Sequence, residues 1–257
     1  MARRRHSKRR RGRGSYAFLY KLLSVLLICA AIIAAMTLFF RVNEIVVTGQ
    51  KRYTAEEIQE ASGVELGSNM YLLNKYDVYR SIAGKLPYIE DIRVNRKLPD
   101  TLLIEVREGG RPFALVQDGS AWLISASGRI VEQMPEGQAG GYGLISGCEL
   151  LAPSVGASIA LATEYAAKQS SLLDLLKALD DAGLTENVDG IRLDDLGYLK
   201  LDYIGRFTVR MPYGADYEWK LETLTQVLES EEIQSNMTGT IDMQLKDEKV
   251  FVIPNER

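Results

Sequence analysis

Few residues in this chain have side chains that could carry out chemistry. The single histidine, His6, lies among arginines near the N-terminus, and the two cysteines are Cys29, in an apolar stretch, and Cys148. Catalytic triads, cysteine–histidine dyads and the usual zinc sites require histidine or several cysteines, so the region after the apolar stretch cannot form them. With one cysteine, that region also cannot close an internal disulfide. The sequence therefore predicts no catalytic residue, no metal site and no cofactor.

Two pairs of adjacent carboxylates are the remaining candidates for acid–base catalysis. Asp180-Asp181 falls at the end of a predicted helix, and Asp194-Asp195 at the end of a predicted strand. Neighbouring side chains on a strand point apart and acidic residues are common in turns, so solvated turns explain both pairs better than catalysis does. Cys148 has no adjacent base and is interpreted as a small packed residue. These observations favour a non-enzymatic protein.

Charge is divided unevenly along the chain. Residues 1–41 contain ten of the 31 lysines and arginines and none of the 34 acidic residues. The rest of the chain therefore has 21 basic and 34 acidic residues, a formal charge of −13. A body with this charge repels phosphate backbones, so we expect no binding to nucleic acid.

Residues 22–40 form an uncharged, apolar stretch that would span roughly 28 Å as a helix, close to the thickness of a bilayer core. A cleavable signal peptide is the alternative, with Ala34 and Ala35 as small residues near a cleavage site, but the stretch is longer than a signal-peptide core. The arginine-rich residues 1–21 place the N-terminus in the cytoplasm and the C-terminal part outside the cell. A basic patch for nucleic acid or anionic lipid explains these residues less well.

The region after the apolar stretch begins with a predicted strand at 42–48. Thr54 and Glu57 form a capping box that starts a short helix ending at Gly63, and a second helix starts near Asn74 and ends before Pro87. Alternating apolar residues then predict strands at 92–95 and 102–107, joined by a turn at 97–100. The predicted order is strand, helix, helix, strand, strand.

The C-terminal half is predicted to contain a second, mixed sheet. Residues 113–131 are typical of a hairpin, and the glycine-rich residues 137–143 indicate a flexible connection. An amphipathic helix follows Ser170-Ser171, and a last helix is capped by Asp216. Further strands are expected at 188–193, 198–203, 207–211, 240–245 and 249–253.

Several of these stretches resemble one known family. They are IVVTG (45–49), GSNMY (67–71), PYI (87–89) and IRVNRKLPDTLLIEV (92–106), with weaker similarity at GCELLAPSVG (147–156) and GTID (239–242). Together they resemble the POTRA module and, more narrowly, the FtsQ/DivIB family of bacterial cell-division proteins. The resemblance implies an α+β ectodomain, with a POTRA-like β-α-α-β-β module and a mixed or antiparallel β-domain with two helices, on a single N-terminal transmembrane helix. The expected divisions are a basic cytoplasmic tail (1–21), a transmembrane helix (22–40), a POTRA-like domain (42–110), a β-domain (111–254) and a short tail (255–257).

The resemblance also implies a function, that of a non-enzymatic divisome scaffold in the cell membrane, enriched at the division septum. Its partners would be FtsL-like and FtsB/DivIC-like single-pass proteins, and through them the septal peptidoglycan synthase. The alternatives are a POTRA-type chaperone or transport module, and a membrane-anchored cell-wall enzyme.

An exposed edge strand is the expected means of binding, and the last strand is the candidate edge. Phe251 would point away from the side of Val250 and Val252, so one face of this strand could meet a partner; alternatively, all three side chains pack within the domain. In the FtsQ/DivIB family the far end of the β-domain carries the partner surface. The candidate contacts are Tyr217, Trp219, Lys220, Lys249, Val250, Phe251 and Val252.

Overall fold

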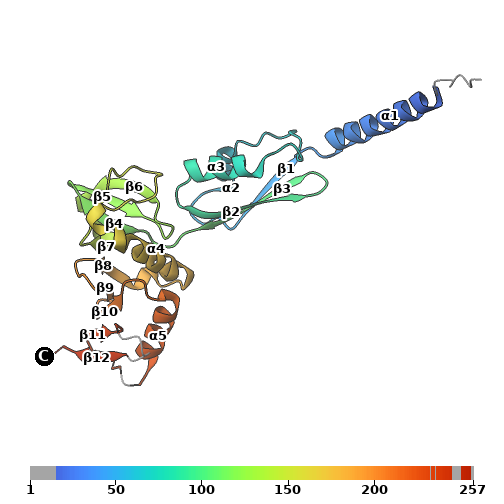
Figure 1. Cartoon of the computed structure of the whole chain (residues 1–257). Helices are drawn as coiled ribbons and strands as arrows, with labels where there is room; N and C mark the ends of the chain where they lie inside the picture. The colour runs from blue at the N-terminus through green and yellow to red at the C-terminus, as the bar shows by residue number, and fades with distance from the viewer. Residues whose placement is uncertain (1–15, 232, 235, 245–249, 256–257) are drawn as a thin grey trace, which may run out of the picture.

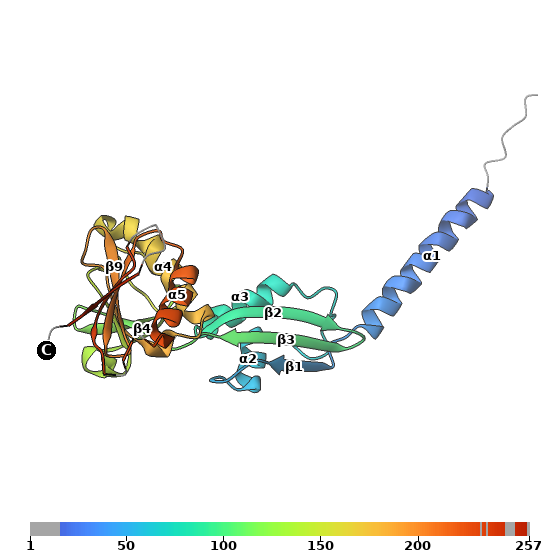
Figure 2. The same cartoon turned by 90° about the horizontal axis from the view of Figure 1, so that it is seen from below.

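The computed structural model describes residues 16–231, 233–234, 236–244 and 250–255. A long helix, α1 (Tyr16–Phe39), is followed by a domain with three strands and then by a domain with nine strands, and the C-terminus lies at the end of the molecule far from α1 (Figures 1 and 2). Within α1, residues Phe18–Thr37 are apolar enough and numerous enough to cross a membrane. The helix begins six residues before the predicted span. Most of the predicted basic tail lies outside the described residues.

The three-stranded domain has the predicted order of elements. It comprises β1 (Glu44–Thr48), α2 (Ala55–Ser62), α3 (Lys75–Lys85), β2 (Ile89–Lys97) and β3 (Thr101–Glu108). β3 lies in the centre of the sheet, parallel to β1 and antiparallel to β2. Ile58 of α2 and Ile82 of α3 are fully buried against Ile104 of β3. The two helices therefore cover one face of the sheet.

Local signals set the ends of both helices in this domain. The Thr54 side chain accepts a hydrogen bond from the Glu57 amide, and the Glu57 carboxylate accepts one from the Thr54 amide at 2.8 Å. Gly63 ends α2 in the left-handed conformation, which glycine adopts without steric cost. Asn74 caps α3 through the Tyr76 amide. These three sequence predictions are confirmed.

The nine-stranded domain forms one mixed sheet in the order β12-β11-β10-β9-β8-β7-β4-β5-β6. Its neighbours are antiparallel except at β10–β11, β4–β7 and β7–β8, which are parallel. Its strands are β4 (Phe113–Gln117), β5 (Ser120–Ile124), β6 (Ile130–Pro135), β7 (Gly143–Ser146), β8 (Val188–Arg192), β9 (Tyr198–Tyr203), β10 (Phe207–Pro212), β11 (Gly239–Asp242) and β12 (Phe251–Pro254). The hairpin predicted at 113–131 corresponds to β4, β5 and the start of β6.

Two helices, α4 (Ala166–Asp181) and α5 (Tyr217–Glu229), cover one face of this sheet (Figure 1). Leu176 of α4 and Leu224 of α5 are fully buried in the same core as Leu201 and Val209 of the sheet. Short 3-10 helices, η2 (Thr163–Tyr165) and η3 (Thr185–Asn187), flank α4. Alternate residues of β9 and β10 point to the opposite face, which carries polar side chains.

Two predictions for this domain are wrong. α4 begins at Ala166, so Ser171 lies inside the helix, where its buried hydroxyl accepts a hydrogen bond from the Gly214 amide at 2.9 Å. The stretch expected to be a flexible connection forms a 3-10 helix, η1 (Glu136–Gly141), and the start of β7. A Cβ atom on Gly143 would lie 2.7 Å from the carbonyl oxygen of Val188, so glycine serves close strand packing here rather than flexibility.

Polar contacts join the two domains near the connection between β3 and β4. The Asp180 carboxylate at the end of α4 accepts hydrogen bonds from the Arg107 guanidinium at 2.5 Å and from the Gly110 amide at 2.7 Å. The Arg129 guanidinium also donates to the Ala83 carbonyl at 3.1 Å. The two domains are therefore joined by polar contacts at two places.

Candidate partner-binding edge of the nine-stranded sheet

β12 is an outer strand of the nine-stranded sheet, as predicted, and its only strand neighbour among the described residues is β11. The two strands are antiparallel, with Thr240 opposite Ile253 and Asp242 opposite Phe251. One step further along this register, the Asn255 amide donates to the Thr238 carbonyl at 2.9 Å. Bonded and non-bonded pairs alternate along an antiparallel ladder. The backbone groups of residues 251 and 253 therefore face β11, and the N–H and C=O of Val252 face outward.

The side chains of β12 divide between the two faces of the sheet. Phe251 is 50% exposed and Ile253 is 52% exposed. Val250 and Val252 are partly buried and pack against the core beneath α4 and α5. The prediction that Phe251 points away from its two valine neighbours agrees with this arrangement. Ile253 was not predicted as a site residue, although its position two residues after Phe251 places it on the same face.

The face that carries Phe251 and Ile253 is polar over the neighbouring strands. Arg210 on β10 lies 3.7 Å from Asp242 on β11, which is the residue opposite Phe251. Further from the edge, the Arg192 guanidinium donates to Asp202 at 2.7 Å. Two exposed apolar side chains thus border a surface of paired charges, and the border coincides with the open backbone edge.

α5 supports the neighbouring strand from the opposite face. Lys220 is 7% exposed, and its ammonium group donates to the Met243 carbonyl at 2.7 Å, just after β11 ends. Burial lowers the pKa of Lys220 below its ordinary value. The same ammonium group lies 5.0 Å from the centre of the Trp219 ring, which is half-buried. Lys220 therefore fixes the end of β11 next to the open edge.

The structure separates the predicted contact residues into three groups. Val250, Phe251 and Val252 lie at the edge with at least part of each side chain accessible, and Trp219 is half-buried on α5 beside Lys220. Tyr217 and Lys220 are buried, and the Tyr217 hydroxyl donates to the Pro212 carbonyl at the end of β10 at 3.1 Å, so both side chains bond to the backbone of their own domain. Lys249 lies outside the described residues.

The residues considered for catalysis have structural contacts or exposed positions instead. The side chain of Asp180 is only 6% exposed and joins the two domains, so the expectation of a solvated turn is wrong for this residue. Asp194 is exposed and accepts a hydrogen bond from Lys200, which lowers its pKa. Burial raises the pKa of Cys148 to about 11, which keeps the thiol protonated near neutral pH. No group of three or more potential metal ligands occurs among the described residues.

Comparison with known proteins agrees with this architecture. Residues 40–108 match the family described as POTRA domain, FtsQ-type, and residues 114–244 match Cell division protein FtsQ/DivIB, C-terminal. Similar proteins include Cell division protein DivIB of Clostridium botulinum (strain Hall), which is 27% identical over 84% of this chain and 82% of the relative. Cell division protein FtsQ of Syntrophotalea carbinolica is 30% identical over 79% of this chain and 71% of the relative. Cell division protein FtsQ of Geotalea daltonii is 27% identical over 86% and 78%.

The fold thus defines a POTRA-containing protein with a C-terminal mixed sheet and one N-terminal helix able to cross a membrane. The chain belongs to the FtsQ/DivIB family of cell division proteins. These relatives are named as cell division proteins and not as enzymes.

Proposed function

We propose that this protein is a non-enzymatic scaffold of the divisome. In this proposal α1 crosses the cell membrane with its N-terminus in the cytoplasm, and both domains lie outside the cell. The protein binds FtsL-like and FtsB/DivIC-like single-pass proteins at the division septum and, through them, helps to recruit or regulate septal peptidoglycan synthesis. The single observation that carries the proposal is the open edge of β12 with two exposed apolar side chains.

An open edge strand supports binding because its backbone already has the geometry of a sheet. A partner segment that pairs with β12 would form hydrogen bonds with the outward N–H and C=O of Val252 and continue the sheet by one strand. Pro254 also points its backbone nitrogen outward and has no N–H to offer, so pairing is expected to end there. The edge therefore accepts a short strand and discourages a long one.

The side chains add apolar contact and specificity to this pairing. Phe251 and Ile253 are each about half exposed, and covering the exposed part of each would contribute roughly 1 kcal/mol. A partner strand with an apolar residue on the same face would supply this contact. The Arg210–Asp242 pair on β10 and β11 lies next to these residues, so a charge from the partner would find its nearest charged groups already paired.

Copurification of the tagged full-length protein from dividing cells tests the proposal. Phe251→Glu should reduce recovery of FtsL-like and FtsB-like partners and septal localisation, because it places a charge where apolar contact is expected. The matched control is Leu196→Glu, since Leu196 is an exposed leucine in the connection between β8 and β9. Equal partner recovery by a folded Phe251→Glu protein would contradict the assignment of the edge.

A second variant tests the backbone contribution. Val252→Pro removes an N–H that faces away from β11, so the ladder between β11 and β12 keeps its hydrogen bonds while the outer edge loses a donor. Partner recovery should fall although Phe251 is unchanged. If only Phe251→Glu reduced recovery, binding would depend on the side-chain face and not on strand addition.

A further inference from the structure

The loop between α2 and α3 is fastened to the chain where it leaves α1. The Met70 amide donates to the Phe40 carbonyl at 2.9 Å, and the Val42 amide donates to the Ser68 carbonyl at 2.9 Å. Arg41 and Asn69 form an antiparallel bridge between these hydrogen bonds. The chain is therefore bonded to the loop from the first residue after α1, and no spacer separates the helix from the domain.

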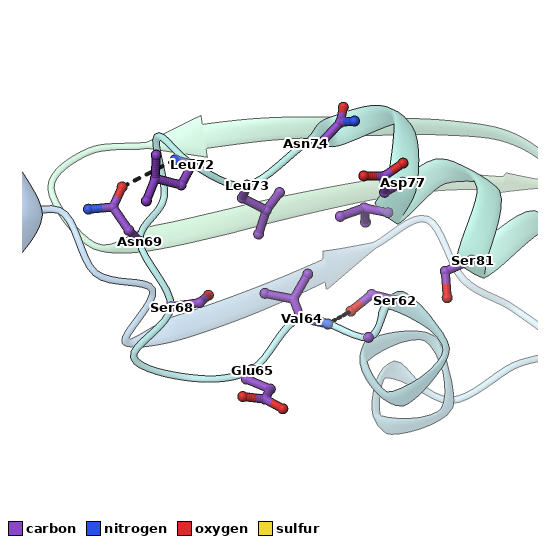
Figure 3. A pocket seen from close by; sticks show the side chains of 12 residues that line it. Ser62, Val64, Glu65, Ser68, Asn69, Leu72, Leu73, Asn74, Asp77 and Ser81 are labelled. Atoms are coloured by element: carbon purple, nitrogen blue, oxygen red, sulfur yellow. Dashed lines mark hydrogen bonds between the residues drawn. The ribbon is translucent and has the colours of Figure 1, made fainter.

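Side chains extend this attachment into the last turn of α1. The Asn69 amide nitrogen lies 3.5 Å from the carbonyl oxygens of both Met36 and Thr37. The Asn69 amide oxygen accepts hydrogen bonds from the backbone of Tyr71 and Leu72 at 2.8 and 3.2 Å. Figure 3 shows Asn69 and Leu72 at the end of the loop nearest α1. Asn69 thus links the last turn of the helix to the residues that follow it in the loop.

The turn between β2 and β3 lies at the same end of the three-stranded domain. The amides of Asn43 and Glu44 donate to the Asp100 carbonyl at 2.8 and 3.3 Å, which holds this turn close to the chain leaving α1. Both views of the molecule place the loop and this turn at the end of the domain that faces α1 (Figures 1 and 2). Leu98 is exposed at the tip of the turn.

Exposed apolar side chains gather at this end of the domain. Among the described residues of the three-stranded domain, the large exposed hydrophobic residues are Leu66, Tyr71, Leu72, Leu98 and Tyr76. The first four lie in the loop or at the tip of the turn, and we call them the proximal patch. Leu72 is 81% exposed, so removing its side chain from water would be favourable.

We propose that the proximal patch rests in the outer interfacial layer of the bilayer that α1 crosses. This proposal relies on α1 being a membrane span, as in the proposed function. Phe18–Thr37 has the length of a bilayer core, so Met36 and Thr37 lie at its outer boundary. Because Asn69 contacts both carbonyls, Tyr71 and Leu72 lie beside that boundary, where aromatic and aliphatic side chains are stabilised.

The charged residues at this end of the domain do not favour anionic over neutral lipids. Arg41 and Lys97 are exposed there, together with the acidic residues Glu44 and Glu65. The mixture gives no net attraction to anionic headgroups, so contact depends on apolar insertion and not on lipid charge. The three-stranded domain is then held against the membrane at two places besides α1, which restricts its tilt.

Fluorescence of the full-length protein in nanodiscs of phosphatidylcholine tests this proposal. Cys29 and Cys148 are replaced by serine, and an NBD label is attached to Leu72→Cys. The control carries the label at Leu196→Cys, because Leu196 is 92% exposed and belongs to the nine-stranded domain. We expect blue-shifted emission and quenching by headgroup-labelled nitroxide lipid at position 72, and water-like emission without quenching at position 196. A label at Leu98→Cys should behave like the one at position 72.

Several outcomes would overturn the proposal. Water-like, unquenched emission at positions 72 and 98 in correctly assembled nanodiscs would show that the patch is not in lipid. Shielding that appears only after an FtsL-like or FtsB-like protein is added would assign the patch to a protein partner. Failure of the protein to enter nanodiscs would remove the membrane span itself, an outcome distinct from loss of partner binding at β12.

Discussion

Asp180 provides the sharpest test of how the two domains are joined. A carboxylate in the last turn of a helix opposes the helix dipole, and α4 has no basic residue in its last turn to compensate. Asp180 is nevertheless almost fully buried, because the Arg107 guanidinium and the Gly110 amide both donate to it. Asp181 is adjacent, exposed and subject to the same helix end. Comparing the two alanine variants therefore separates the stability contributed by the contacts of Asp180 from the effect of the helix dipole.

The expected difference between the two variants follows from the contacts that Asp181 lacks. A hydrogen bond from an amide to a charged carboxylate contributes about 1.5 to 3 kcal/mol. Arg107 is 54% exposed, so its ion pair adds no more than about 1 kcal/mol. The gain in helix propensity and the relief of the dipole are shared by both variants and cancel. Asp180→Ala should thus be less stable than Asp181→Ala by about 2 to 3 kcal/mol.

Urea unfolding followed by tryptophan fluorescence measures this difference. Trp122 and Trp219 lie in β5 and α5, so the signal reports the nine-stranded domain. Adding Arg107→Ala to each variant should cost stability in the Asp181→Ala background and little in the Asp180→Ala background. Free energies of unfolding that agree within about 0.5 kcal/mol for the two alanine variants would refute the reasoning, because the contacts of Asp180 would then contribute no measurable stability.

Three further predictions concern backbone conformation, alkaline pH and thiol reactivity. Gly49→Ala should destabilise the three-stranded domain by about 3 kcal/mol or more, because Gly49 has φ +90° and a Cβ atom there would lie 2.0 Å from a carbonyl oxygen of β3. Gly67 has φ +86° and open space around it, so Gly67→Ala should cost only about 1 kcal/mol. Equal rates of amide hydrogen exchange in β3 of the Gly49→Ala and Gly67→Ala proteins would argue against the steric explanation. Burial and the hydrogen bond to Glu132 raise the pKa of Tyr88 to about 12. The contribution of Tyr88 to stability is therefore complete below about pH 10 and is lost between about pH 10 and 12. Tyr88→Phe should flatten the curve of unfolding free energy against pH in that window, and an unchanged curve would contradict this. In a Cys29→Ser background, Cys148 should react with iodoacetamide at pH 8 much more slowly in the folded protein than in urea, because burial raises its pKa to about 11; equal rates would show an accessible thiol.

Sequence patterns predicted the elements of this protein better than their pairing. Thr54 and Asp216 are recognisable as helix caps, and Asn74 as the place where a helix starts, because each acts within three residues of its own position. The parallel pairing of β10 with β11, across α5, depends on contacts between residues far apart in the sequence. Periodicity alone does not specify such a register. The order of the nine strands was therefore not predicted, although the edge position of β12 was.

The site shows the same limit at the level of single residues. Lys220 is predicted as a partner contact from its position near the far end of the β-domain, yet its ammonium group donates to a backbone carbonyl 23 positions later in the chain. Asp180 is predicted to lie in a solvated turn because acidic residues are common in turns, yet it is bound by Arg107 and Gly110, which precede it by about 70 residues. Both residues are charged groups whose hydrogen-bond partners are brought to them only by the tertiary fold.

The position of β12 at the far end of the sheet also sets a distance. Neighbouring strands are separated by about 4.8 Å, so nine strands place β12 roughly 38 Å from β6. The three-stranded domain, about 30 Å long along the nine residues of β2, lies between this sheet and α1 (Figure 1). Under the proposed function, a partner anchored in the same membrane as α1 would need a rigid stalk to reach β12. At 1.5 Å per residue, a helix of roughly 20 to 45 residues covers 30 to 68 Å. In that case the fold would select partners by the length of their stalk as well as by the sequence of their strand.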